Sequence, residues 1–236
     1  MIEDCAHFNL EIQFLFINYL NFNVMAIFDS NLLGKVTKSV GNVTMCYTNK
    51  RNIAKAKVFK RKDKPTPEIL DQRARMKVLV QLSRRLLAVI RKGFVGTGNG
   101  TTSNAFVKAN MGAVSVAEGH VATMEFEQMK VATGILDVPV VTATYSADTS
   151  KYLFEQEENN DENANALAND KVYAVLFETV LKRLKIVALR DRGESGSTSF
   201  GLPKGWDNTK VVAYCFATSK NGMLVSDSDY LDIEGA

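Results

Sequence analysis

The side chains with the clearest chemical potential are a concentrated set of lysines and arginines. Six lie between positions 55 and 64, and three more recur along a predicted helix that follows. The set comprises Lys55, Lys57, Lys60, Arg61, Lys62, Lys64, Arg73, Lys77 and Arg84. Such a face could neutralise phosphates, so polyanion binding through the basic region 50–92 is one hypothesis. The alternatives are a solvated basic surface, or one that pairs with the acidic part of a neighbouring copy.

Hydrolytic and metal chemistry have little support in the chain. Its only histidines are His7 and His120, too few for a His-dependent triad or a His-rich metal site. The serine-rich stretch at 193–199, GESGSTS, lacks the Gly-x-Ser-x-Gly spacing that exposes a nucleophilic serine. We interpret this stretch as a turn.

Two further motifs resemble ligand loops without completing them. Residues 161–165 imitate the start of a calcium loop, but Ala166 and Val172 replace its glycine and its closing glutamate. The glycine-rich stretch at 93–100 follows a predicted helix and lacks a Gly-Lys-Ser/Thr ending, which favours a linker over a phosphate loop. The sequence therefore predicts no catalytic residue, metal, cofactor or small-molecule substrate, and indicates that the protein is not an enzyme.

Charge is strongly segregated along the chain. Residues 35–92 hold 17 Lys and Arg against 3 Asp and Glu, a net charge of +14. The remaining residues hold 12 against 23, a net charge of −11. This segregation assigns different electrostatic roles to the two parts, and it favours a binding role for the protein.

Composition indicates a soluble globular protein. The 236 residues are 46% hydrophobic and 23% charged, enough to bury a sizeable core. The three cysteines are Cys5, Cys46 and Cys215, and their wide spacing fits neither a metal site nor a disulfide framework. We interpret them as small apolar residues in a reduced compartment.

One long amphipathic helix is predicted over 66–92. Thr66 is a suitable N-cap, Pro67 suits the first helical position, and Gly93 supplies a stop. Apolar residues recur at helical spacing through this segment. They are Ile69, Met76, Leu79, Leu82, Leu86, Val89 and Ile90.

A two- or three-stranded antiparallel sheet is predicted before this helix. Its expected strands are short Val- and Thr-rich segments at 32–40 and 42–47 and an alternating run at 52–59. After it, a second helix is expected from Ser103 to about Gly112, and a strand over 121–126.

From Pro139 onward, seven strand-length runs separated by turn residues predict an immunoglobulin-like β-sandwich without the Cys-Trp-Cys signature of antibody domains. The runs are 140–145, 152–156, 171–179, 184–190, 198–202, 210–218 and 224–233. Asn221-Gly222 predicts the hairpin turn that closes the last pair.

Residues 1–24 differ from the rest of the chain in their pattern of apolar, polar and basic residues. The apolar run at 14–22 contains Asn18 and Asn21, is too short to span a bilayer, and has no basic residue before it. We interpret 1–24 as a non-native or disordered extension, with a weak membrane-surface helix as the alternative. Neither a signal peptide nor a transmembrane segment is predicted.

The chain resembles an uncharacterised family of about 200-residue proteins from Bacteroidetes and related mobile elements. The resemblance rests on the pairs Gly34-Lys35, Thr66-Pro67 and Gln72-Arg73 and on Gly41-Asn42-Val43, and in the second half on Trp206 and Tyr230. It covers residues 25 to about 233 and is more specific in the first half. The family has a domain of unknown function, so the resemblance implies a fold and no activity.

The sequence thus predicts an α+β protein. The expected parts are a non-native or disordered extension at 1–24, a basic domain at 25–137 with a small antiparallel sheet and one long helix, and an immunoglobulin-like β-sandwich at 138–236. The expected function is a structural or protein-interaction module of a phage-related or mobile-element assembly, located in the cytoplasm or virion. Self-association or a protein partner is expected, with nucleic-acid binding as the alternative.

Deletion of residues 1–24 tests the assignment of the extension. Because this segment lacks capping, amphipathic and targeting patterns, we expect a chain that begins at Met25 to keep its fold and nearly its thermal midpoint. Circular dichroism melts of both chains measure this, and a large drop in the midpoint would show that the segment contributes to the core.

Overall fold

The computed structural model describes residues 25–29, 32, 34–57, 64–96, 100–159 and 165–235. Contacts divide the chain into two units, Met1–Lys64 and Pro65–Ala236. The sequence places a domain boundary at 137/138 instead. The division differs because helices pack directly on strands of the second unit, which makes them one body. The expected extension at 1–24 lies outside the described residues.

The first unit contains a four-stranded antiparallel sheet with strand order β1-β4-β3-β2. Its strands are β1 (Met25–Phe28), β2 (Lys38–Val40), β3 (Val43–Thr48) and β4 (Arg51–Ala56). A two-residue turn joins β3 to β4, and its residues Asn49 and Lys50 both have positive φ, as primed hairpin turns require. Strand β1 is an addition to the two or three strands that the sequence indicates.

Asn52 organises the first unit. It is the one described residue of this unit that is buried. Its side-chain amide donates to the carbonyl of Gly34 at 2.9 Å and accepts from the amide of Val36 at 3.0 Å. These bonds hold the segment before β2 against β4, since a buried side-chain amide is costly unless paired.

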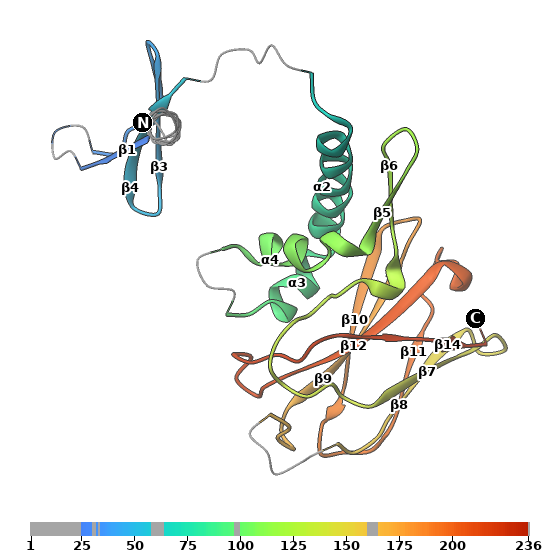
Figure 1. Ribbon diagram of the computed structural model, residues 1–236. Helices are drawn as coiled ribbons and strands as arrows, with labels where there is room; N and C mark the ends of the chain where they lie inside the picture. Colours follow the sequence, from blue (N-terminus) through green and yellow to red (C-terminus); the bar gives the residue numbers. More distant parts are fainter. Residues whose placement is uncertain are drawn as a thin grey trace, which may run out of the picture. The chain divides into compact units, whose positions relative to one another are not determined.

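The second unit begins with helices, and the long helix expected over 66–92 is interrupted. The structure has α2 (Pro67–Arg85) and α3 (Leu87–Gly93), separated at Leu86, where φ is −90° and ψ is 9°. The chain changes direction there (Figure 1), so that both helices turn their apolar sides towards the same sheet. Helix α4 (Thr102–Ala109) follows, capped by the hydroxyl of Thr101.

Helix α3 ends at Gly93, where the sequence predicts a stop, and this glycine also has a second role. A Cβ atom at this position would collide with the carbonyl oxygen of Val131 and with Ala132. The amide of Thr133 donates to the carbonyl of Gly93 at 2.9 Å. Glycine is therefore needed for the close approach of two backbones.

The strands of the second unit form two four-stranded sheets and one hairpin. One sheet has the order β10-β9-β12-β13, the other the order β11-β8-β7-β14, and β5 pairs with β6. The bounds are β5 (Val114–Ala117), β6 (Val121–Met124), β7 (Val141–Ser146), β8 (Lys151–Gln156), β9 (Lys171–Glu178), β10 (Arg183–Asp191), β11 (Gly196–Gly201), β12 (Val211–Thr218), β13 (Asp229–Leu231) and β14 (Ile233–Glu234). Short 3₁₀ turns occur at Met111–Ala113, Phe126–Gln128 and Asn208–Lys210.

The sheet β10-β9-β12-β13 is covered on both faces. Successive side chains of a strand point to opposite faces, so Ala174 and Leu176 of β9 pack towards the second sheet while Val175 and Phe177 pack towards the helices. Strand β12 divides its side chains in the same way. In Figure 1 the helices lie on one side of this sheet and β7, β8 and β11 on the other. The unit therefore has three layers and a mixed α+β fold.

Two cysteines, Cys46 and Cys215, lie within the described residues. Cys215 is free and fully buried, and burial raises the pKa of its thiol to about 12. Cys46 is also free and is half-buried.

A buried ion pair closes one end of the second unit. Asp170 precedes β9 and Arg192 follows β10, and each side chain is at most 1% exposed, with 3.3 Å between Nε and the carboxylate. Arg192 also donates to the carbonyl of Asp137 at 2.6 Å. Burial raises the pKa of Asp170, although the adjacent guanidinium opposes this shift. The pair joins three segments that are distant in sequence.

We expect Asp170→Ala to lower the free energy of unfolding by about 3–5 kcal/mol, because it leaves the buried guanidinium without a counter-charge. The double variant Asp170→Leu/Arg192→Met should recover most of this loss, since it removes both charges. Urea denaturation measures both values. Equal destabilisation by the single and double variants would show that the charges themselves matter little.

The layered core predicts which fragments fold. A fragment from Pro139 onward would expose the outer-face residues Val175, Phe177, Tyr214 and Phe216, each worth about 1.5–3 kcal/mol of burial. That sum is comparable to the whole stability of a domain. We therefore expect residues 65–236 to melt cooperatively and residues 139–236 to melt without a cooperative transition. A cooperative, strand-rich melt of the shorter fragment would contradict this.

Candidate interaction surface on helix α2

Helix α2 buries one side and exposes the other. Leu79, Leu82 and Ser83 are buried against the core. On the outer side is a shallow depression of about 420 Å³, lined by Arg73, Met76, Lys77, Val80, Gln81 and Arg84. The three helix residues of the sequence-predicted basic set, Arg73, Lys77 and Arg84, thus share one depression.

A second depression of about 700 Å³ lies between α2 and the β5–β6 hairpin, and it shares Gln81 and Arg84 with the first. It is lined by Val78, Gln81, Leu82, Arg84, Arg85, Ala122, Thr123, Met124, Phe126 and Lys182. Apolar side chains line much of it, and three cationic side chains, Arg84, Arg85 and Lys182, border it. We call the two depressions together the α2 surface.

The turn between β9 and β10 brings Lys182 to this surface. The buried carboxylate of Glu178 accepts a hydrogen bond from the amide of Leu181 and so fixes the turn. Lys182 has a φ of 56°, and its ammonium lies 5.9 Å from the centre of the Phe126 ring, within range of a cation–π interaction.

The opposite wall is held by contacts of the hairpin and the segment after it. The Nδ1 atom of His120, at the hairpin tip, lies 2.5 Å from a carboxylate oxygen of Asp71 on α2. The hydroxyl of Tyr214 donates to the carbonyl of Phe126 at 2.6 Å. Figure 1 shows the hairpin lying beside α2. The depression is therefore built by the fold and does not depend on a free loop.

The cations of the α2 surface have no carboxylate partner among the described residues. Among the described residues, the ion pairs with a nitrogen–oxygen distance of at most 4.0 Å are His120–Asp71, Lys130–Asp227, Lys171–Asp191 and Arg192–Asp170. None involves the α2 surface. Met76, which lines the first depression, is a large apolar side chain that is 44% exposed. The surface thus offers positive charge and apolar area together.

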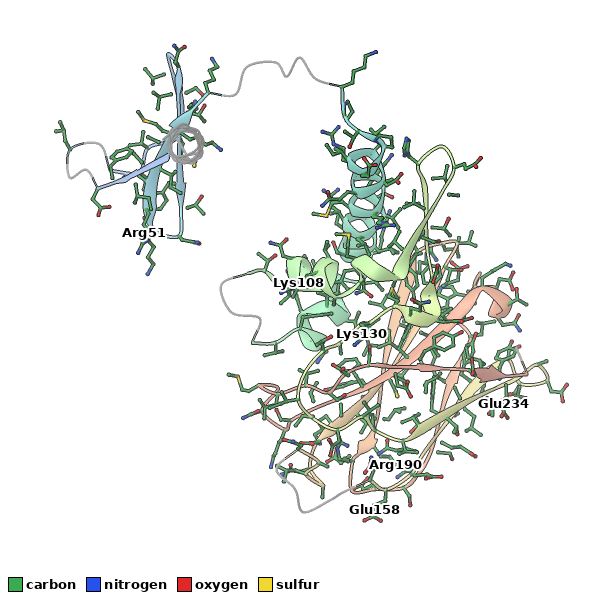
Figure 2. All side chains as sticks on the ribbon, in the orientation of Figure 1. Arg51, Lys108, Lys130, Glu158, Arg190 and Glu234 are labelled. Atoms are coloured by element: carbon green, nitrogen blue, oxygen red, sulfur yellow. The ribbon has the colours of Figure 1, made fainter. Side chains whose placement is uncertain are left out.

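The remaining residues of the predicted basic set lie elsewhere. Lys55 is on β4 and Lys57 directly follows it, and both are exposed in the first unit. Arg51, also basic, lies at the start of the same strand (Figure 2). Lys64 is exposed at the end of that unit. Lys60, Arg61 and Lys62 lie outside the described residues.

Sequence reasoning misses Arg85, Lys182 and Phe126. Arg85 is adjacent to Arg84 and has no separate signal. Lys182 and Phe126 come from segments about 100 and 40 residues beyond α2, and only the packing of α2 on the sheet brings them to it. An apolar-periodic pattern identifies the buried side of a helix, but it cannot identify its neighbours.

Across the described ranges, no helix is both long enough and apolar enough to cross a bilayer. Nor do three or more His, Cys, Asp or Glu side chains of those ranges come together in a group that could hold a metal ion. The candidate calcium-loop positions 161–164 are outside these ranges.

No known protein family, curated protein or solved structure matches this chain. The geometry and charge of the α2 surface are therefore the basis for a functional proposal.

Proposed function

We propose that this protein is a non-catalytic interaction module, and that its α2 surface binds an acidic protein segment that carries apolar anchors. The observation that carries the proposal is the combination of uncompensated cations with an apolar floor in the depression beside α2. Arg84, Arg85 and Lys182 border a floor that includes Met124 and Phe126.

The two parts of this surface favour different features of a partner. Apolar area removed from water stabilises a complex by about 25 cal/mol per Å², so an apolar floor favours a partner with aliphatic or aromatic side chains. Cations at the rim add specificity and speed association with a partner of opposite charge. A partner with both features is an amphipathic acidic segment, such as a helix laid along a groove.

Polyanion binding is the second candidate function. Arg73, Lys77 and Arg84 line one depression, and Lys55, Lys57 and Lys64 are exposed in the first unit. Phosphates would satisfy these charges without using the apolar floor. Aromatic side chains for stacking single strands are few here, so any binding of this kind would be to the backbone of the nucleic acid.

The strand order supports an immunoglobulin-like arrangement of the two facing sheets in this proposal. Strands β7, β8 and β11 correspond to A, B and E, and strands β10, β9, β12 and β13 correspond to C′, C, F and G. Trp206 departs from antibody domains, because it lies in the turn before β12 and not on strand C. Domains of this type commonly serve recognition, which is consistent with a binding module.

The family resemblance sets the context of the proposal. A member of a family found in Bacteroidetes and related mobile elements would act as a structural component of a phage-related assembly, in the cytoplasm or in the virion. The segregation of charge, +14 over residues 35–92 and −11 over the rest, suits a component that assembles with oppositely charged surfaces.

Fluorescence anisotropy with two labelled probes separates the candidate functions. The probes are a short peptide of glutamate and leucine that can form an amphipathic helix, and a short DNA duplex. Because the peptide needs both charge and apolar contact, we expect Arg73→Gln/Lys77→Gln/Arg84→Gln to weaken its binding about tenfold or more, and Met76→Gln to weaken it as well. The matched control Lys108→Gln/Lys151→Gln/Lys204→Gln removes the same charge from exposed sites elsewhere and should have little effect.

The DNA probe tests the second candidate. If it is correct, DNA should bind tightly at low salt, and the triple α2 variant should flatten the dependence of log affinity on log salt by about three units. Lys57→Gln/Arg61→Gln/Lys62→Gln should do the same in the first unit, while Met76→Gln should leave DNA binding unchanged.

Equal peptide binding by the triple α2 variant and its control would refute the interaction surface.

A further inference from the structure

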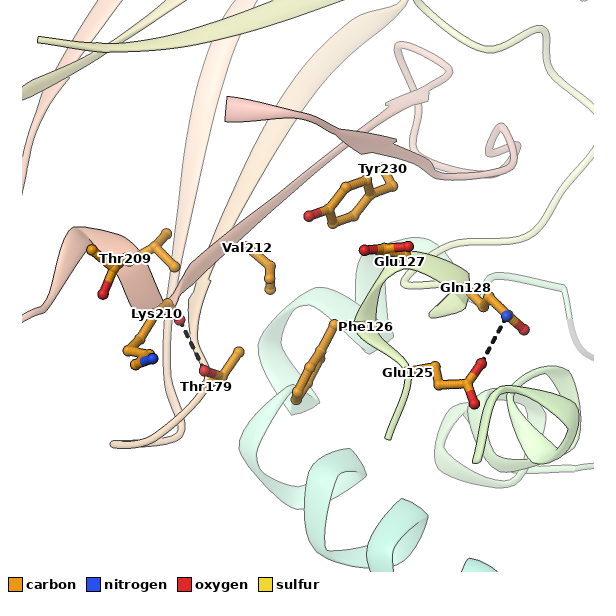
Figure 3. Close-up of a pocket in the computed structure, with 10 residues that line it drawn as sticks. Glu125, Phe126, Glu127, Gln128, Thr179, Thr209, Lys210, Val212 and Tyr230 are labelled. Atoms are coloured by element: carbon orange, nitrogen blue, oxygen red, sulfur yellow. Dashed lines mark hydrogen bonds between the residues drawn. The ribbon is translucent and has the colours of Figure 1, made fainter. Parts of the chain in front are cut away.

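A third depression, of about 550 Å³, adjoins the α2 surface and has a different charge. It is lined by Glu125, Phe126, Glu127, Gln128, Thr179, Thr209, Lys210, Val211, Val212 and Tyr230. Figure 3 shows Glu127 beside Tyr230 at one end and Lys210 with Thr209 at the other. We call this depression the acidic pocket, because it contains two carboxylates and one ammonium.

The carboxylates of the acidic pocket are available to a cation. Glu127 is exposed and forms no ion pair among the described residues. Glu125 accepts one neutral hydrogen bond, from the side-chain amide of Gln128 at 2.7 Å. Burial, Asp232 and Glu127 raise the pKa of Tyr230, so its phenol stays protonated and can donate. Lys210, the one cation lining the pocket, lies at the far end from Glu127 (Figure 3).

The acidic pocket borders the depression of about 700 Å³ between α2 and the β5–β6 hairpin, which we call the basic depression. Phe126 lines both. The turn between β9 and β10 also borders both, because its first residue, Thr179, lines the acidic pocket and its last, Lys182, lines the basic depression. Between them, Val180 and Leu181 are 66% and 45% exposed. Opposite charges therefore flank an exposed apolar turn.

We propose that this region is a self-complementary interface between two copies of the chain. A two-fold axis near the apolar turn would place the basic depression of each copy against the acidic pocket of the other, because an isologous interface pairs each patch with its counterpart twice. Arg84 and Arg85 of one copy face Glu125 and Glu127 of the other, and Val180 and Leu181 of both copies meet at the centre.

Charge complementarity is the argument for a second copy as the occupant. The basic depression has three cations and no carboxylate, and the acidic pocket supplies carboxylates that lack a cationic partner of their own. Desolvated aliphatic side chains at the centre with charged groups around them match the usual anatomy of a protein interface. This inference rests on the proposed interaction function and names the partner for it.

Paired charge reversal tests the interface in the full chain. Variant A carries Glu125→Lys/Glu127→Lys, and variant B carries Arg84→Glu/Arg85→Glu. We expect the unaltered chain to form dimers that weaken with added salt, as measured by sedimentation velocity over a range of concentrations. Each variant alone should raise the dissociation constant at least tenfold, because like charges then face each other. An equimolar mixture of A and B should restore the dimer, because opposite charges face each other again.

Further variants make the outcome decisive. Val180→Ser/Leu181→Ser should weaken the dimer with little change in thermal midpoint, since both side chains are exposed. Glu157→Lys/Glu158→Lys, a matched reversal at exposed positions at the other end of the unit, should leave the dimer unchanged (Figure 2 labels Glu158).

A monomer at every concentration would overturn the inference, as would a dimer insensitive to A and B, or folded variants whose mixture stays monomeric. A monomer that still binds the acidic peptide would overturn the dimer and leave the proposed function standing. If the unaltered chain does not bind the acidic peptide but forms a dimer that A and B disrupt, the proposed function fails and the dimer stands.

Discussion

The fold depends on a sheet that must be covered on both faces. Strands β9 and β12 carry apolar side chains on each side, so neither the second sheet nor the helices alone can remove them from water. Parallel sheets usually show this double burial, but here the strands are antiparallel. The requirement forces helices from the first half of the unit and strands from the second half into one body, and it explains why the chain divides at 64/65.

This constraint also positions the α2 surface. The break at Leu86 lets α2 and α3 follow the sheet separately, and the buried residues of α2 lie in its second half. The outward side of the helix is left free, with its cations in a row. The same sheet ends in the turn that carries Lys182, so hydrogen bonds hold the site on both sides. Its cations come from segments that are far apart in the sequence.

Local signals account for most of the elements that the sequence predicts correctly. Each predicted strand of the second unit has a counterpart within a few residues, although the last run is shorter than expected and is split into β13 and β14. The turn at Asn221-Gly222 is present, with Gly222 at positive φ. No glycine or proline marks the helix break at Leu86, so the sequence pattern gives no sign of it; in the structure the hydroxyl of Ser83 donates back to the carbonyl of Val80 one turn before the break.

The site was predictable only in part for the same reason. Helical spacing groups Arg73, Lys77 and Arg84, but Lys182 and Phe126 join them only through the packing of distant segments. One neglected signal was present. The runs at 172–177 and 211–217 are continuously apolar and do not alternate, which indicates strands buried on both faces. That pattern implies a third layer, and with it a close approach of the helices to the strands.

The double burial of β12 has a consequence for biosynthesis. The apolar side of α2 and α3 leaves the ribosome before its cover exists, because β12 begins about 125 residues after Leu86. At typical elongation rates this delay lasts roughly 6 to 25 s. During that interval a nascent chain exposes a helical apolar stripe beside a basic segment, and transiently exposed apolar surface is prone to aggregation. Slow translation of the last hundred residues should therefore lower the yield of this protein more than slow translation of the first hundred.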